Sequence, residues 1–329
     1  MDEKNIKALE ELEKTSDEKY IEMLKNGEIK KILRAIGLFP DQTIINDILI
    51  LSQKPEATCV KRMRDWNYYR RSVNKSEKSI KVISNYIEKF DQDYEEEDGK
   101  IFTKGITKLR TDIGYLFDIS QTNGKEYNYL YSNKETVAQH FDAAKSALEK
   151  TAREYKFEFR DIDVVSIVDK DSKTITLKDG MELNEVVNRL IKEVTGILLE
   201  TRQAEGLNAE AKPNIDEIEL NSAIYAIHSK LGLDLPEYDF SEISKYTEEE
   251  MFKFRDNLNR VRSVSKQLLS NFERAIEKSV RNLEKEDEKV EETVKVEEKQ
   301  QEEVKVEEPV VKPKRTRTKK QAESEVEHA

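Results

Sequence analysis

The sequence has 329 residues, of which 38% are charged and 36% hydrophobic, so part of the chain must lie outside any packed core. It has no apolar run of about 18 residues, and its charged first residues lack the apolar centre of a secretion signal. We therefore expect a soluble, cytoplasmic protein with no membrane partner. The single cysteine excludes an internal disulfide, and three widely spaced histidines argue against a Cys/His zinc site.

The first part of the chain has the pattern of helices. Apolar residues at helical spacing over residues 3–36 predict two helices, with Ser16 or Asp17 capping the second and a turn at residues 37–40. The strongly apolar segment 44–51 predicts a buried helix.

Two short β-strands are expected after these helices. Residues 80–83 and 115–119 have the apolar composition of buried strands. The acidic, polar segment 86–105 between them suits an insertion or a long hairpin loop. We place the end of a first domain near residue 135.

The second half mixes a β-hairpin with helices. A helical pattern spans residues 136–155, and β-branched residues at 163–168 and 174–177 predict a hairpin. Further helices are expected at residues 185–199, 215–231 and 247–283. We assign this second domain to residues 136–283.

Residues 284–329 have the composition of a disordered tail. Between residues 284 and 309 twelve acids face five lysines, and a basic tip, KPKRTRTKK, follows at residues 312–320. The predicted fold class is therefore α+β, with two domains and a disordered charged tail.

A basic stretch stands out in this acidic protein, whose net charge is -11. Between Lys54 and Lys81, nine Lys or Arg residues face three acids, and aromatic residues lie among them. Cations that hold phosphates beside rings that stack on bases are typical of single-stranded nucleic-acid binding. The candidate DNA-binding residues are Lys61, Arg62, Arg64, Trp66, Tyr68, Tyr69, Arg70, Arg71, Lys75, Lys78 and Lys81. The alternative is that Trp66 belongs to the core and the charges form a solvated face.

Two motifs in this region carry a family resemblance. The run from Ile50 to Val82 resembles the N-terminal domain of ArdC-type antirestriction proteins and the related LtrC-like proteins, and residues 118–122 (DISQT) match a second family motif. The matching positions in the first run are Gln53, Pro55, Ala57, Thr58, Trp66, Arg71, Val73, Lys75, Glu77, Lys78 and Ile80. Ser76 and Ser79 depart from the family's glycines. The resemblance implies a domain that binds single-stranded DNA, in which we expect Gln53, Pro55 and Thr58 to form turns rather than bind the ligand.

The second half resembles the zincin-like, ImmA/IrrE-related metallopeptidase domain of the same family. There a helix carries His-Glu-x-x-His, whose histidines bind zinc. In this chain Lys192 and Gly196 stand at the two histidine positions, Glu193 at the general base and Glu219 at the third ligand. A lysine repels Zn²⁺ and a glycine has no donor, so we expect no metal, no cofactor and no catalysis. We expect the lone nearby histidine, His228, to be packed or solvated rather than a ligand. A Glu193–Glu219 carboxylate pair has no further support in the sequence.

The resulting hypothesis is a non-enzymatic protein that binds and protects single-stranded DNA for a plasmid, conjugative element or phage, with little sequence preference. The basic tip of the tail either adds a phosphate contact, or the acidic linker before it competes with DNA. The alternative hypothesis is a protein-interaction or scaffold protein that uses residues 136–283 to bind a partner, with the basic stretch incidental. An active metallopeptidase requires two ligands that the sequence lacks.

Overall fold

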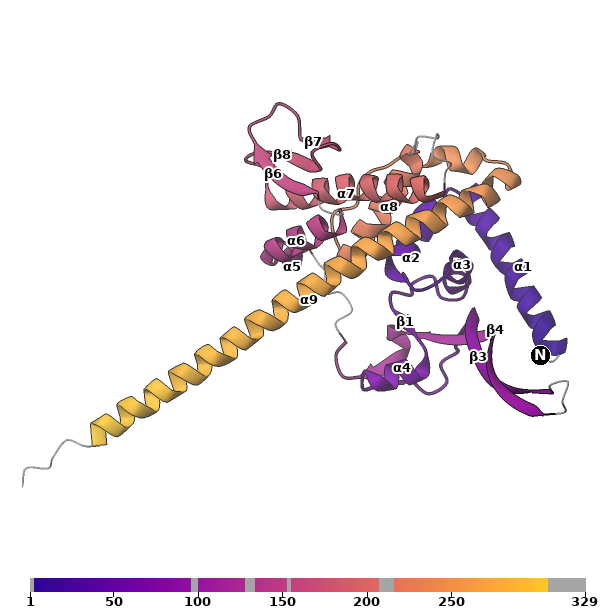
Figure 1. Cartoon of the computed structure of the whole chain (residues 1–329), viewed down its shortest axis with the longest axis horizontal. Coiled ribbons are helices and arrows are strands. Elements are labelled where there is room, and N and C mark those ends of the chain that lie inside the picture. Colours follow the sequence, from indigo (N-terminus) through magenta and orange to yellow (C-terminus); the bar gives the residue numbers. More distant parts are fainter. Residues whose placement is uncertain (1–2, 96–99, 128–133, 153–154, 207–215, 307–329) are drawn as a thin grey trace, which may run out of the picture. The chain divides into compact units, whose positions relative to one another are not determined.

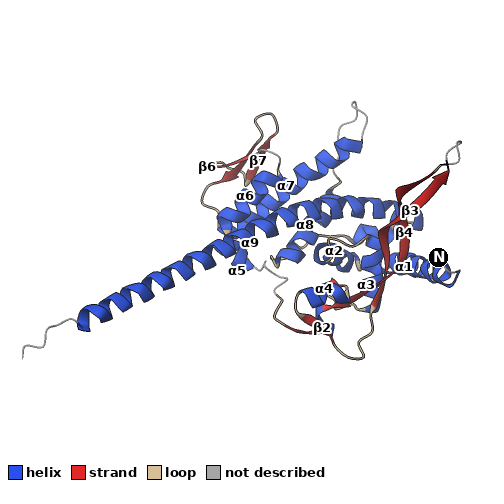
Figure 2. Cartoon of the chain, turned by 60° about the horizontal axis from the view of Figure 1, so that its bottom comes forward, coloured by secondary structure: helices blue, strands red, loops and turns tan. Residues whose placement is uncertain are grey.

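The computed structural model describes residues 3–95, 100–127, 134–152, 155–206 and 216–306. Helices and strands are mixed along the chain, which confirms the α+β class (Figure 1; Figure 2). Residues 1–280 form one compact unit and residues 281–329 another. The division into domains at residue 135 stays a prediction. No helix in the described part of the chain is long and apolar enough to span a bilayer.

The first half contains helices followed by antiparallel strands. The helices are α1 (Glu3–Lys25), α2 (Ile29–Leu38), α3 (Ile44–Gln53) and α4 (Met63–Tyr68), with the 3-10 turn η1 (Ile119–Gln121). The strands are β1 (Val60–Lys61), β2 (Arg71–Val73), β3 (Ile80–Glu95), β4 (Ile101–Asp118) and β5 (Thr122–Gly124). They form one sheet in the order β1-β4-β3 and a second, β2-β5, and all these pairs are antiparallel.

The second half contains a small sheet covered by helices. The helices are α5 (Lys134–Gln139), α6 (Phe141–Thr151), α7 (Leu183–Gly206), α8 (Glu217–Leu231), η2 (Ser241–Lys245) and α9 (Glu248–Val306). Strands β6 (Lys156–Arg160), β7 (Ser166–Asp169) and β8 (Thr174–Lys178) form a sheet in the order β6-β8-β7. The predicted hairpin is confirmed as β7 and β8, and the parallel strand β6 beside it was not predicted.

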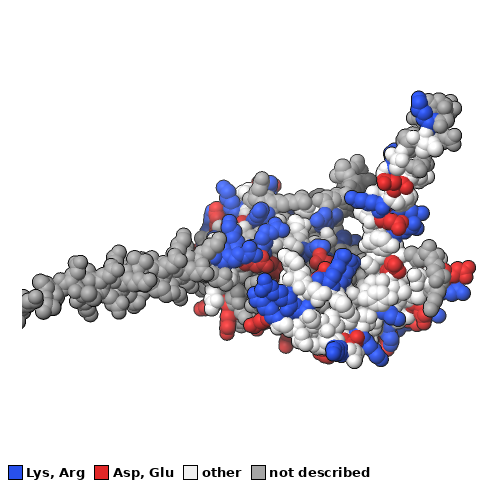
Figure 3. Space-filling model, turned by 90° about the horizontal axis from the view of Figure 1, so that it is seen from below, with Lys and Arg blue, Asp and Glu red and all other residues white. Residues whose placement is uncertain are grey.

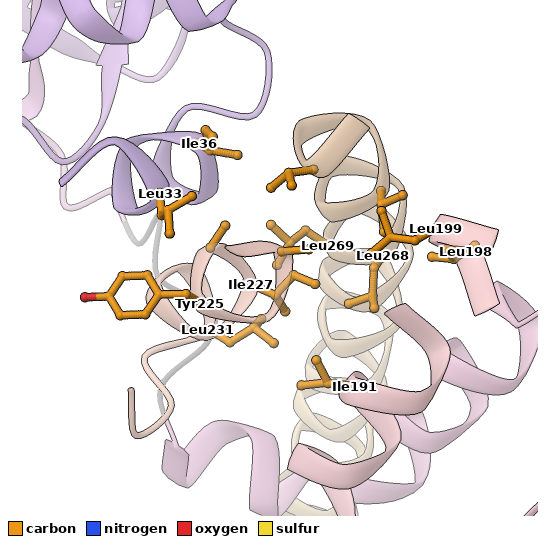
Figure 4. Packing of buried hydrophobic residues seen from close by; sticks show 14 of the residues in the cluster. Leu33, Ile36, Ile191, Leu198, Leu199, Tyr225, Ile227, Leu231, Leu268 and Leu269 are labelled. Carbon is orange, nitrogen blue, oxygen red and sulfur yellow. The ribbon is translucent and has the colours of Figure 1, made fainter. Parts of the chain in front are cut away.

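The largest hydrophobic core joins helices from both halves. Leu33 and Ile36 of α2 pack toward α8, and the far side of α8 faces α7 and α9 (Figure 4). Polar contacts support the same arrangement: Tyr20 donates to the Met251 carbonyl over 2.8 Å, and the buried Asp47 pairs with Arg262. A second, smaller core lies between α3 and the base of β3 and β4.

Three sequence expectations for the N-terminal helices need correction. Helix α1 continues through Ser16 and Asp17. Neither side chain caps a helix: Ser16 donates to the Ile45 carbonyl, and Asp17 pairs with Arg255. The break falls at Gly27, whose φ of 71° suits a glycine. Gly37 lies inside α2 rather than in a turn. The position requires glycine because a side chain there would collide with the carbonyl oxygen of Ala226 in α8.

The remaining corrections concern the hairpin and two helices. Most of segment 86–105 is paired strand, in register from Ile80↔Leu116 to Glu95↔Ile101. The helix expected over residues 136–155 is broken at His140, which bonds Ser279 across 3.0 Å. Helix α9 passes its expected end at Leu283 and runs to Val306, a stretch of good helix formers without Gly or Pro. The basic tip at residues 312–320 lies outside the described residues.

Candidate nucleic-acid interface

Trp66 attaches α4 to the sheet. The indole is fully buried, its Nε1 donates to the Phe117 carbonyl over 2.8 Å, and the Tyr127 ring meets it edge-on at 5.6 Å. A ring in this position cannot stack on a base, so Trp66 is a core residue and not a contact residue. This corrects the sequence assignment of Trp66 to the DNA-binding set.

Three tyrosines form an aromatic group beside this helix, here called the tyrosine cluster: Tyr68, Tyr69 and Tyr127. Tyr68 is 82% exposed and meets Tyr69 edge-on at 5.2 Å, and Tyr69 leans on Tyr127 at 4.6 Å. The Lys61 ammonium lies 5.1 Å from the ring centre of Tyr69 and 5.4 Å from that of Tyr127. The exposed Tyr68 ring can stack on a base, and the Lys61 ammonium over the two neighbouring rings can bind a phosphate of the same strand. The sequence identified Tyr68 and Tyr69 but missed Tyr127.

Two of the predicted DNA-binding cations, Arg62 and Arg71, form hydrogen bonds within the protein. Arg71 donates from Nε to the Thr122 hydroxyl (2.9 Å), and from its terminal nitrogens to the carbonyls of Lys125 (2.6 Å) and Thr122 (3.0 Å). Arg62 donates to the Ser84 hydroxyl over 3.1 Å, which ties the start of α4 to β3. Arg71 therefore supports strand β5, and its charge is only partly available to a ligand.

The other predicted cations remain on the surface. Arg64, Arg70, Lys75, Lys78 and Lys81 are all exposed. Arg64 lies 3.6 Å from Asp65, and no carboxylate of the described residues pairs with the three lysines. Lys and Arg side chains are frequent on the face that carries α4 (Figure 3).

The motif residues hold the loops that carry these cations. Asp118 accepts from the backbone amides of Thr58 (2.8 Å) and Cys59 (3.0 Å). Gln121 donates to Glu77 and to the Lys78 carbonyl, both over 2.8 Å. The two sequence motifs therefore contact each other, and their role is structural.

Side-chain amides of α3 extend the sheet. The Gln53 amide pairs with the backbone N–H and C=O of Lys81, and the Asn46 amide does the same with Ile83. Alternate residues of β3 are thereby bonded as they would be by another strand. These hydrogen bonds fix the position of Lys81. Gln53, which the sequence predicts to form a turn, therefore binds the edge of strand β3.

The β3–β4 hairpin adds a second surface that the sequence analysis missed, here called the ribbon face. Because directly opposite residues of antiparallel strands share a face, Tyr86 with Arg110, Glu88 with Lys108, Phe90 with Ile106, and Gln92 with Lys104 lie on one side. Tyr86, Phe90 and Tyr94 are 45%, 37% and 36% exposed. Arg110 is paired with Glu88 at 2.7 Å, whereas Lys104 and Lys108 have no ion pair among described residues. The face begins at Ser84, the partner of Arg62, so it continues from the surface around α4.

The two carboxylates of the expected zinc site, Glu193 and Glu219, bind different partners. Glu193 accepts from the Ser166 hydroxyl over 2.7 Å and pairs with Arg189 at 2.8 Å. Glu219 is buried and binds Arg260 through both oxygens, at 2.8 and 3.2 Å. Lys192 and Gly196 share helix α7 with Glu193. Within the described ranges, no three His, Cys, Asp or Glu side chains come together as a metal site would require.

Comparison with protein families finds no match, and comparison with curated proteins finds no relative. Two solved structures are similar to this chain: the metal-free and the Mn(II)-bound crystal structures of the antirestriction protein ArdC from plasmid R388. Both are 15% identical, with TM-scores of 0.33 and 0.34. They cover 70% and 69% of this chain, and 85% and 87% of their own. At this level of similarity the roles of individual residues rest on the geometry of this chain.

Proposed function

We propose that this protein binds single-stranded DNA without strong sequence preference, through the tyrosine cluster, the exposed cations around it and the ribbon face. The observation that carries the proposal is the exposed Tyr68 ring against Tyr69, whose own ring lies under the Lys61 ammonium. Lys75, Lys78 and Lys81 are free of carboxylate partners in the described part of the chain. Cations of this kind gain affinity by releasing counterions, and exposed rings stack on any base.

The proposed biological role is protection of single strands for a plasmid, conjugative element or phage, as the motif resemblance implies. In this proposal the protein performs no catalysis. Lys192 and Gly196 stand at the positions of the metal ligands, and the two remaining carboxylates are held in ion pairs by Arg189 and Arg260.

Fluorescence anisotropy with a labelled mixed-sequence single strand and the matching duplex, over a salt series, tests the proposal. We expect tighter binding to the single strand and a steep decrease in affinity with salt. The triple variant Arg64→Gln, Lys75→Gln, Lys78→Gln should reduce the slope of log K against log salt by about 2, since each single-strand phosphate contact contributes about 0.7.

The matched control removes the same charge elsewhere. Lys30, Lys150 and Lys156 are exposed on α2, α6 and β6, so their triple replacement by Gln should leave the slope nearly unchanged. Equal slopes for the two triple variants would rule out this interface. An intact fold without binding to either DNA form would instead favour the protein-interaction role.

A further inference from the structure

The second half contains a cavity that the proposed function does not use. It has a volume of about 600 Å³ and lies among α7, α8, the β7–β8 sheet and the segment after α8. This volume lies within the range of small-molecule sites, roughly 300 to 1,000 Å³. Apolar side chains form part of its wall, among them Val165, Leu235 and Tyr238. Lys192, the residue at the first expected zinc-ligand position, lines it.

Three cations line this cavity: Lys178, Arg189 and Lys192. Arg189 is held through Nε, which is 2.6 Å from the Ser166 hydroxyl and 2.8 Å from Glu193. Its terminal nitrogens bond none of the described residues, and Lys178 and Lys192 have no ion pair there either. Two carboxylates, Glu185 and Asp234, also line the cavity. Glu193 balances the charge of Arg189 and fixes its guanidinium, and the terminal nitrogens of Arg189 together with the ammonium groups of Lys178 and Lys192 are suited to an anion such as phosphate.

Two buried hydrogen-bond acceptors lack a donor at the same place. His228 is 2% exposed, and its Nδ1 lies 2.9 Å from the Asp234 carbonyl, which can only accept, so Nδ1 carries the hydrogen. Burial lowers the pKa of His228 and keeps the ring neutral, so its Nε2 bears a lone pair. Neither Nε2 nor the buried Oδ1 of Asn188, another lining residue, has a partner in the described structure. Buried acceptors without a donor are uncommon and costly. Both atoms are covered by neighbouring side chains, so a ligand in the cavity would supply the missing donors once those side chains move aside.

We propose that this cavity binds a small phosphomonoester that carries N–H donors, of which a nucleoside monophosphate is the simplest example. The phosphate would lie at Lys178, Arg189 and Lys192, the donors at His228 and Asn188, and the base against the apolar wall. The same chemistry is present in a free nucleotide and at the 5′-phosphate end of a DNA strand. The site is separate from the nucleic-acid interface, so either proposal can fail without the other.

Isothermal titration calorimetry on the full chain tests this site with deoxyadenosine 5′-monophosphate, inorganic phosphate and deoxyadenosine as probes. We expect the nucleotide to bind more tightly than phosphate, and phosphate more tightly than deoxyadenosine. Lys192→Met should weaken nucleotide binding about 10- to 100-fold, the range for a hydrogen bond to a charged group. Lys156→Met, at an exposed lysine outside the cavity, should leave it unchanged.

Side-chain ¹⁵N NMR of His228 gives a second readout that needs no substitution. Nucleotide binding should shift the Nε2 resonance, because a lone pair without a partner becomes hydrogen-bonded. Competition between the nucleotide and a 5′-phosphorylated oligonucleotide, beside the unphosphorylated strand, distinguishes the two sources of the ligand. Absence of nucleotide binding at millimolar concentration, or equal binding by wild type and Lys192→Met, would overturn the proposal.

Discussion

Arg71 and Lys75 have the same charge and lie close together in the sequence, but their environments differ. Arg71 is half-buried and uses three nitrogens to bind Thr122 and Lys125, whereas Lys75 is exposed and unpaired within the described residues. Composition cannot separate the two roles, because both side chains fit a basic stretch equally well. The difference depends on strand β5, which lies far along the chain from β2.

Trp66 and Tyr68 should respond in opposite ways to substitution. Trp66→Phe leaves the Phe117 carbonyl without its donor, so we expect a loss of about 1–3 kcal/mol in unfolding free energy and unchanged DNA affinity. Tyr68→Ala removes an exposed ring, so we expect unchanged stability and a loss of about 1–3 kcal/mol in single-strand affinity. Urea unfolding and anisotropy on both variants measure the four values. A large affinity loss in folded Trp66→Phe would contradict this assignment.

His228 should make stability depend on pH. Because burial lowers its pKa in the folded state below the ordinary value of 6.5, the unfolded chain binds the proton more readily. This contribution to stability is present above pH 6.5 and is lost as the pH falls through the folded-state pKa. Urea unfolding across this window should therefore show decreasing stability toward acid. His228→Asn retains a donor for the Asp234 carbonyl and should flatten this part of the profile; an unchanged profile would exclude His228 as its source.

At the scale of elements, Gly37 controls the approach of α2 to α8. Helix propensity alone predicts that Gly37→Ala stabilises the protein by about 1 kcal/mol. The structure predicts the opposite sign, since the added methyl group would collide with the Ala226 carbonyl in the facing backbone. We expect destabilisation of about 1–3 kcal/mol, measured by urea unfolding. Gly196→Ala is the matched control, because a Cβ at that helical glycine meets no atom within 4 Å.

The β3–β4 hairpin allows its two faces to be compared directly. Lys104→Gln with Lys108→Gln changes the ribbon face, while Lys89→Gln with Leu109→Ala changes the opposite face. If single-stranded DNA continues from α4 onto the ribbon face, the first pair should weaken binding to long oligonucleotides more than to short ones. The second pair should weaken neither. Anisotropy over a series of lengths measures this, and equal effects of the two pairs would exclude the ribbon face from the interface.

The hairpin also illustrates which features of the fold can be read from the sequence. The segment 44–51 predicts a helix because it is strongly apolar apart from Asn46 and Asp47, and Thr43 caps it as α3. In β3, Tyr86, Phe90 and Tyr94 recur at every fourth position, a spacing that fits a helix and a strand equally. Asp91, Gln92 and Gly105 are weak strand formers, so the segment resembles a loop. Pairing between strands distant in sequence decides its structure, and no local pattern encodes that pairing.

At the scale of the molecule, the largest core combines α1, α2 and α3 with α7, α8 and α9. Buried polar contacts cross the same boundary: Arg262 pairs with Asp47 and also donates to the Phe39 carbonyl over 2.9 Å. Removing one member of such a buried pair costs about 3–5 kcal/mol. Residues 1–135 by themselves would therefore expose Leu24, Ile32 and Leu33 to water and leave the Asp47 carboxylate unpaired.

We accordingly expect a fragment of residues 1–135 not to fold alone, although it contains the whole proposed DNA interface. A chain of residues 1–280 should unfold in one cooperative transition, since that unit contains both cores. Calorimetry and circular dichroism on the two shortened chains measure this, and adding residues 136–280 in trans should restore structure to the fragment. Cooperative unfolding of residues 1–135 alone would instead support an independent domain that ends near residue 135.

The chain of residues 1–280 also tests the effect of the tail on DNA binding. Its affinity for single-stranded DNA is compared with that of the full chain. Tighter binding by the shortened chain indicates that the acidic linker competes with DNA, and weaker binding indicates that the basic tip adds a contact.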